Sequence, residues 1–220
     1  MRGIFVTGTD TGIGKTVVSA ALVCAWRSAE KVCYWKPVQT GIEEDDDTAT
    51  VRKLAACSVE EIFDRGFRLE KPLSPHLSAR LAGVEIGVGK ILQFAEKIPE
   101  ERFLIVEGAG GLLVPLNEEQ LMIDLIRALG LPVLIVARSS LGTINHTLLT
   151  VESLRRRDLK ISGIVLVGEP NAENKKAIEH FSNVPVLAEM PKFEKLNERV
   201  LKNWSEENRS RLQKNQHRPR

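Results

Sequence analysis

The chain has 220 residues, of which 43% are hydrophobic and 27% are charged, and its formal net charge is +2. This composition is ordinary for a soluble globular protein that can bury a full core. A net charge so close to zero gives no overall field that would favour nucleic acid or a membrane surface as a partner. Polar Thr7 and Asp10 interrupt the first apolar run, unlike a signal peptide, and no apolar segment approaches the roughly 20 residues that cross a bilayer. We therefore expect a cytoplasmic protein.

Short apolar runs alternate along the chain with longer segments of helical periodicity. The runs are rich in Val and Ile and carry few charges, as is typical of strands covered on both faces. The predicted strands are residues 3–8, 31–38, 103–110, 132–139, 161–167 and 185–191. The predicted helices are residues 16–29, 47–56, 88–98, 122–130 and 143–157. This alternation predicts an α/β fold, a single domain with a doubly wound, mainly parallel sheet flanked by helices.

The sequence becomes polar from Lys192 onward and ends in SEENRSRLQKNQHRPR. We therefore divide the chain into a domain at residues 1–191 and a polar C-terminal helix or tail at residues 192–220. Terminal residues are often unanchored, so we expect this segment to be frayed, solvated and partly disordered. A tail that binds an acidic partner is the less supported alternative.

The segment GTDTGIGKT, residues 8–16, joins the first predicted strand to the first predicted helix. Glycines let successive backbone N–H groups turn inward around an anion, at a helix N-terminus that favours negative charge. Lys15 could then reach the outer phosphates of a nucleotide, and the Thr16 hydroxyl could ligate Mg²⁺. The usual phosphate-binding loop has its first glycine one residue later, where this chain has Thr9. We interpret the segment as a variant of that loop.

A lysine and a threonine follow the second predicted strand. Lys36 stands where that strand should end, and Thr40 lies in the turn after it. Ligands of open α/β sheets bind beyond the carboxyl ends of the strands, so we expect Lys36 to face the same crevice as Lys15. A solvated surface charge is the alternative, but Pro37 and Gly41 shape the loop around Lys36 and favour a functional role.

Acidic residues near two of these elements are candidate metal ligands. Asp47 ends the acidic run at residues 43–47 and opens a predicted helix, so capping alone could explain it. Glu107 closes the third predicted strand, which is otherwise apolar. A lone acid there is costly unless it is paired or bound to metal. Glu107 is therefore the better candidate of the two.

Five blocks of sequence occur in the order and spacing of one enzyme family. They are GTDTGIGKT, YWKPVQTG, LSPHLSA, VEGAGGLLVPL and SLGTINHTLLT. Together they resemble dethiobiotin synthetase, the ATP-dependent carboxylase that closes the ureido ring in biotin biosynthesis. The resemblance runs in register from residue 1 to about residue 191. The variant phosphate loop, with its extra residue, is the loop of that family.

The resemblance implies a P-loop NTPase fold and a homodimeric cyclo-ligase that acts on 7,8-diaminononanoate (7,8-diaminopelargonate). In that reaction CO₂ forms a carbamate on one amine of the substrate. The carbamate attacks the γ-phosphate of ATP to give a carbamic–phosphoric anhydride. The second amine then displaces phosphate, which leaves dethiobiotin and ADP.

The resemblance also implies roles for individual residues. The residues assigned to catalysis, as cations or hydrogen-bond donors at the γ-phosphate and carbamate, are Lys15, Lys36, Thr11 and Thr40. The residues assigned to Mg²⁺ are Thr16, Asp47 and Glu107. The residues assigned to the nucleotide are Thr9, Asp10, Thr11, Gly12, Ile13, Gly14, Lys15, Thr16, Thr40, Val167 and Gly168.

Two further groups are assigned to the substrate. The residues around the diamine and carbamate are Lys36, Thr40, Pro75, His76 and Gly110, with His76 as a wall of the site rather than a base. The residues that hold the distal carboxylate, from the neighbouring subunit, are Gly142, Thr143, Ile144 and Asn145. Free N–H groups at the start of a helix suit an anion, although a simple helix cap explains the same residues locally.

Three other functional classes are the alternatives. A partitioning-type switch ATPase has a related loop with a lysine where this chain has Asp10. An amidating synthetase for corrinoid acids carries a separate glutaminase domain, for which this chain is too short. A non-catalytic binding module would not require the lysines and carboxylates described above.

The residues at the end of the fifth predicted strand, 161–167, favour weak selectivity for the nucleobase. Family members that read adenine often have an asparagine there, whereas this chain has Val167 and Gly168 in the block ISGIVLVGEP. Because that amide is absent, we expect kcat/KM values for ATP, CTP and GTP to lie within about a hundredfold of one another. Steady-state kinetics with each nucleotide test this expectation, and a larger preference for ATP would contradict it.

Overall fold

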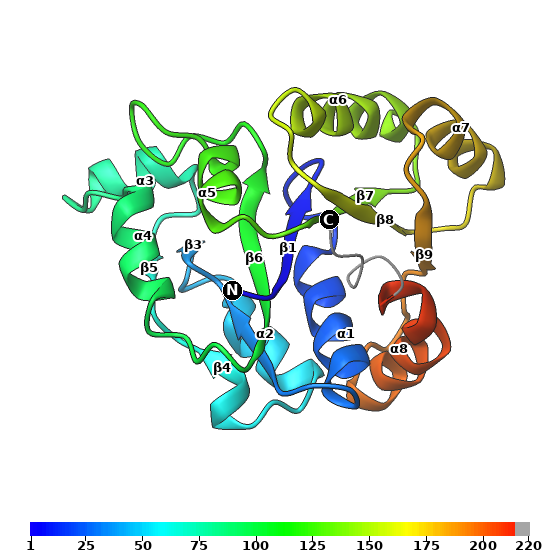
Figure 1. The fold of residues 1–220 in the computed structure, drawn as a ribbon, viewed down its shortest axis with the longest axis horizontal. Coiled ribbons are helices and arrows are strands. Elements are labelled where there is room, and N and C mark those ends of the chain that lie inside the picture. Colours follow the sequence, from blue (N-terminus) through cyan, green and yellow to red (C-terminus); the bar gives the residue numbers. More distant parts are fainter. Residues whose placement is uncertain (214–220) are drawn as a thin grey trace.

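Seven strands form the central sheet of residues 1–213, the part of the chain that this computed structural model describes (Figure 1). They run in the order β4-β2-β6-β1-β7-β8-β9, and all neighbouring pairs are parallel. Their bounds are β1 Gly3–Gly8, β2 Val32–Trp35, β4 Ile62–Phe63, β6 Phe103–Gly111, β7 Val133–Arg138, β8 Ile161–Val167 and β9 Val186–Met190. The predicted α/β fold with a mainly parallel sheet is confirmed, and β1 lies at the centre of that sheet.

Helices cover both faces of the sheet, which explains why the strands are apolar without alternation. The helices on one face are α1 Lys15–Arg27, α2 Asp47–Leu54 and α8 Glu198–Gln213. The helices on the other face are α4 Val88–Ala95, α5 Met122–Leu129, α6 Thr143–Arg155 and α7 Ala172–Ser182. Along β1, the side chains of Ile4 and Val6 pack in the core on the face covered by α1, α2 and α8. The side chain of Phe5 packs in the core on the opposite face. None of the helices in residues 1–213 combines the length and apolar character that a bilayer span requires.

The interpretation of residues 31–38 as one strand is wrong, because Pro37 divides the segment. Proline has no N–H for the hydrogen-bond ladder of a sheet. After it, β3 (Val38–Thr40) pairs with β5 (Phe67–Leu69) in a separate two-stranded sheet. Lys36 is thereby left at the carboxyl end of β2, between the two sheets. The remaining short elements are α3 Pro75–Leu81, beside the small sheet, and the 3-10 helix η1 Val59–Glu61, beside β2.

The C-terminal helix α8 is docked along α1 rather than frayed (Figure 1). Leu201, Trp204 and Leu212 are buried in the core that α1 shares with the sheet. Gln213 Nε2 donates a hydrogen bond to the Ala25 carbonyl oxygen at 3.0 Å. An apolar stripe of few residues on a polar helix is therefore sufficient to anchor this segment.

The expectation of a solvated, frayed segment is consequently wrong for residues 198–213. Residues 214–220, the rest of the predicted tail, lie outside the described residues. The division of the chain at residue 191 stays a prediction.

We expect Leu201→Ala to lower the free energy of unfolding by about 2–5 kcal/mol, because it deletes a fully buried side chain from the core between α8 and α1. Lys202→Ala, at an exposed position on the same helix, should change it by less than about 0.5 kcal/mol. Urea denaturation of both variants and the original chain gives these values. Equal effects of the two substitutions would show that α8 contributes nothing to the core.

Candidate active site

The loop between β1 and α1 turns sharply at two glycines. Gly12 has a φ of 68°, and Gly14, the N-cap of α1, has a φ of 97°. Residues with a Cβ adopt such angles at a cost, and a Cβ on Gly14 would lie 3.1 Å from Val167 Cγ1. Among the described residues no side chain caps the first turn of α1. The N–H groups of that turn are therefore free to bind an anion such as phosphate.

Lys15 is folded back along this loop. Its Nζ donates to the Asp10 carbonyl oxygen at 3.0 Å, and 7% of the residue is exposed. Burial, and then repulsion from Lys36, lower the pKa of Lys15 from 10.5 to about 8. The Asp10 carboxylate accepts a hydrogen bond from Arg138 at 2.5 Å, which ties the loop to the end of β7. Arg138 was not predicted, because no local sequence pattern relates positions 128 residues apart.

Three side-chain oxygens from α1, α2 and β6 converge beside the loop. Thr16 Oγ1 lies 2.6 Å from Asp47 Oδ1 and 3.0 Å from Glu107 Oε1. Residues 1–213 contain no group of three or more His, Cys, Asp and Glu side chains that could hold a metal ion. Mg²⁺, however, commonly binds through one or two carboxylates and keeps several waters. Two carboxylates and a hydroxyl at these spacings fit that requirement.

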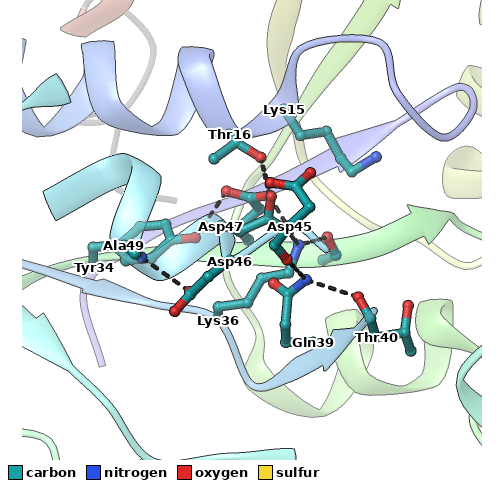
Figure 2. A network of polar contacts seen from close by, with 12 residues as sticks. Lys15, Thr16, Tyr34, Lys36, Gln39, Thr40, Asp45, Asp46, Asp47 and Ala49 are labelled. Atoms are coloured by element: carbon teal, nitrogen blue, oxygen red, sulfur yellow. Dashed lines mark hydrogen bonds and ion pairs between the residues drawn. The ribbon is translucent and has the colours of Figure 1, made fainter. Parts of the chain in front are cut away.

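The ammonium group of Lys36 lies between the same two carboxylates. Figure 2 shows it beside Asp47. Its Nζ is 2.5 Å from Asp47 Oδ2, 2.9 Å from Glu107 Oε1 and 3.0 Å from the Gly108 carbonyl oxygen. Burial lowers the pKa of Lys36, but the charges of Glu107 and Asp47 outweigh burial and raise it. Burial likewise raises the pKa of Asp47, and the charge of Lys36 outweighs it and lowers that pKa. Lys36 and Asp47 therefore stay ionised.

Two buried polar residues that the sequence analysis did not single out support this network. Tyr34 OH donates to Glu107 Oε2 at 2.9 Å. Burial, and then the charge of Glu107, raise the pKa of Tyr34 well above 10.0, so the hydroxyl keeps its proton. Gln39 Nε2 donates to the carbonyl oxygens of Thr40 and Asp45 at 2.9 Å each, which fixes the loop between β3 and α2. Tyr34 stands two residues before Lys36 and Gln39 three residues after it. This closeness in the sequence is the one feature that could have indicated their role.

A cavity of about 590 Å³ lies over this network. Lys15 and Lys36 both line it, as expected for residues that follow the carboxyl ends of β1 and β2. The predicted residues that line it are Thr11, Gly12, Ile13, Gly14, Lys15, Thr16, Lys36, Thr40, Asp47, Pro75, Glu107 and Gly110. The lining residues that were not predicted are Gln39, Gly41, Glu44, Asp45, Pro72, Leu73, Ser74, Ala109 and Val114.

The other predicted residues lie outside this cavity. Thr9 and Asp10 line a second cavity of about 320 Å³, together with His146 of α6. His76 bonds through Nδ1 to Ser74 Oγ at 3.1 Å. The predicted residues at the end of β8, near the loop glycine Gly14, are Val167 and Gly168. The predicted residues at the start of α6, which line neither cavity, are Gly142, Thr143, Ile144 and Asn145.

Comparison with known proteins identifies relatives across almost the whole chain. Residues 2–200 match the AAA domain family. The chain is 50% identical to an ATP-dependent dethiobiotin synthetase BioD of Paramagnetospirillum magneticum, over 86% of this chain and 88% of that protein. It is 47% identical to a biotin biosynthesis bifunctional protein BioCD of Bordetella avium, over 94% of this chain but only 43% of that longer protein.

Solved structures with the same fold are more distant in sequence. The septum site-determining protein MinD of Pyrococcus horikoshii, complexed with Mg-ADP, is 17% identical and superimposes with a TM-score of 0.58. The match covers 94% of this chain and 95% of MinD. At this identity the similarity supports the fold alone.

Proposed function

We propose that this chain, which belongs to the ATP-dependent dethiobiotin synthetase family, closes the ureido ring of dethiobiotin from 7,8-diaminononanoate, CO₂ and ATP. The observation that carries the proposal is the convergence of a phosphate-binding loop, two buried lysines and two carboxylates on one cavity. The enzyme is a ligase of biotin biosynthesis. Its products would be dethiobiotin, ADP and phosphate.

Phosphoryl transfer depends mainly on positioning and on charge stabilisation. The carbamate oxygen formed from CO₂ and one substrate amine would attack the γ-phosphorus, with ADP as the leaving group. The second amine would then attack the carbonyl carbon of the anhydride, and phosphate would leave as the ring closes. Lys15 and Lys36 enter the same cavity, where their charges would stabilise the γ-phosphate and the carbamate.

Thr16, Asp47 and Glu107 would hold Mg²⁺, which when bound would neutralise charge on the nucleotide phosphates. With both carboxylates so engaged, the Lys36 ammonium would be less firmly held by them and could turn toward the carbamate. In the structure, Lys36 Nζ contacts both carboxylates at 2.5 and 2.9 Å. Its hydrogen bond to the Gly108 carbonyl oxygen would keep the ammonium group within the cavity after those contacts weaken. Thr11 and Thr40, which line the same cavity, would donate hydrogen bonds to the carbamate or phosphate.

The nucleotide phosphates would lie in the loop at residues 9–16, where the first-turn N–H groups of α1 are uncapped. Val167 packs beside this loop, with Gly168 next to it. We place the nucleobase on that side. Pro75 and Gly110 line the same cavity, and the diamine would bind beside them.

We further propose that the enzyme is a homodimer in which one subunit supplies the start of α6 to the site of the other. Gly142 to Asn145 lie outside the main cavity of their own chain. Leu141 beside them is 99% exposed, and Leu113 and Leu149 are both 56% exposed around the second cavity. Exposed apolar side chains gathered in this way favour coverage by another protein surface. The N–H groups of α6 would then bind the distal substrate carboxylate.

We expect Lys36→Ala to lower kcat by about 10²–10³, because it removes a group that stabilises transition-state charge. The assay supplies 7,8-diaminononanoate, bicarbonate, Mg²⁺ and ATP, and it detects dethiobiotin by mass spectrometry. Lys90→Ala removes a lysine from an exposed pair with Glu85 and should leave turnover unchanged. Near-normal turnover of Lys36→Ala would remove Lys36 from the mechanism, and no dethiobiotin from the original chain would refute the proposed function.

A shared active site predicts that two inactive variants complement each other. Lys36→Ala would disable one half of each site, and Asn145→Asp would repel the substrate carboxylate from the other half. In a symmetric dimer, random mixing of the two variants should restore about a quarter of the original activity, because half of the dimers then contain one intact site. Activity that stays at the level of the separate variants after subunit exchange would place both residues in the same site of one chain.

A further inference from the structure

We propose that Tyr34 is a positioning residue for the Glu107 carboxylate and that its hydroxyl sets the affinity of the site for Mg²⁺. The inference rests on the proposed function in taking Thr16, Asp47 and Glu107 as the metal site. Tyr34 lines neither cavity. It acts on the metal through Glu107.

Both oxygens of the Glu107 carboxylate have partners on the protein. Oε1 accepts hydrogen bonds from Lys36 Nζ at 2.9 Å and from Thr16 Oγ1 at 3.0 Å. Oε2 accepts one from Tyr34 OH at 2.9 Å. The terminal torsion of a glutamate is broad and permits the carboxylate to rotate. The donor on Oε2 holds the second oxygen and so restrains this rotation, which helps to keep Oε1 directed at Thr16 and Lys36.

The position of this hydroxyl is fixed by the core. Tyr34 and Glu107 are both 0% exposed, so bulk water does not compete for their hydrogen bond. The Tyr34 ring belongs to the core between the sheet and α1, and it reaches the polar network from the side of α2 (Figure 2). On neighbouring β6, Tyr34 is paired with Ile105, two residues before Glu107. The ring is thus held where its hydroxyl can meet the carboxylate.

Removing the hydroxyl would leave Oε2 as a buried acceptor without a donor and would free the carboxylate to turn. Loss of a partner behind a metal ligand typically lowers metal affinity about 10- to 100-fold. A tyrosine that only fills the core would instead lower thermal stability and leave metal affinity unchanged. The two roles are therefore separable by measuring metal binding and unfolding on the same variant.

The first test compares Tyr34→Phe with the original chain and with Ser205→Ala. Ser205 is a matched control, because its buried hydroxyl donates to the Leu201 carbonyl oxygen within α8, outside the network. Mn²⁺ is titrated into the full chain with one equivalent of ADP, and free Mn²⁺ is counted by electron paramagnetic resonance. We expect the dissociation constant to rise about 10- to 100-fold in Tyr34→Phe and to stay constant in Ser205→Ala. Unchanged Mn²⁺ affinity in Tyr34→Phe would overturn the proposal.

A double substitution tests whether Tyr34 acts through Glu107. If it does, adding Tyr34→Phe to Glu107→Gln should weaken Mn²⁺ binding no further than Glu107→Gln alone. A second full loss in the double variant would mean that Tyr34 acts by another route and would overturn the inference.

A third measurement does not depend on the folding of any variant. Tyr34 is the only tyrosine in the sequence, so growth on 3-fluorotyrosine labels this position alone and keeps its hydroxyl. We expect the ¹⁹F resonance to move when Mg²⁺ is added with ADP, and to move far less with ADP alone. A resonance that does not respond to Mg²⁺ would contradict the proposal. Dethiobiotin synthesis by the unsubstituted chain is measured separately, so failure of the proposed function is distinguishable from failure of this inference.

Discussion

The placement of the Lys36 ammonium between Asp47 and Glu107 is the constraint on which the site depends. Moving a charged group from water into a protein interior costs several kcal/mol, and only close, well-aligned partners offset that cost. Here the partners lie 2.5 and 2.9 Å from Nζ. Lys36 follows the end of β2, Asp47 starts α2 and Glu107 lies in the middle of β6. These three elements must therefore hold their relative positions closely, or the ion pairs are lost.

The sheet meets this requirement through two interruptions of regular structure. Pro37 ends β2 and leaves Lys36 outside the ladder. In β6, the register with β1 shifts directly after Glu107, where Val6 pairs with Glu107 but Gly8 pairs with Gly111. The extra residues of such a bulge leave backbone groups unpaired, and the Gly108 carbonyl turns to accept a hydrogen bond from Lys36. The glycine-rich sequence after Glu107 permits this path.

The sequence predicted what depends on local pattern and missed what depends on long-range contact. Continuous apolar runs indicated the long strands, and glycines before Lys15 indicated the phosphate loop, because both signals are contained in a few residues. The docking of α8 was missed, since three buried apolar side chains among many charged ones give a weak signal. The hydrogen bond from Tyr34 to Glu107 joins residues 73 positions apart. In the sequence, Tyr34 is indistinguishable from an ordinary strand residue. Only the sheet order, which places β2 beside β6, brings its hydroxyl to Glu107.

The two lysines of the cavity are not equivalent, and the difference follows from their partners. Lys15 has a backbone carbonyl as its hydrogen-bond partner, so burial dominates and its pKa falls to about 8. Lys36 has two carboxylates, so its pKa rises in spite of its deeper burial. An ammonium group bonded to one neutral carbonyl can exchange that contact for an anion at little cost, which suits Lys15 to capturing phosphate. In the proposed mechanism, Lys36 would be released only when Mg²⁺ engages its two carboxylates, which would couple the availability of the ammonium group to metal binding.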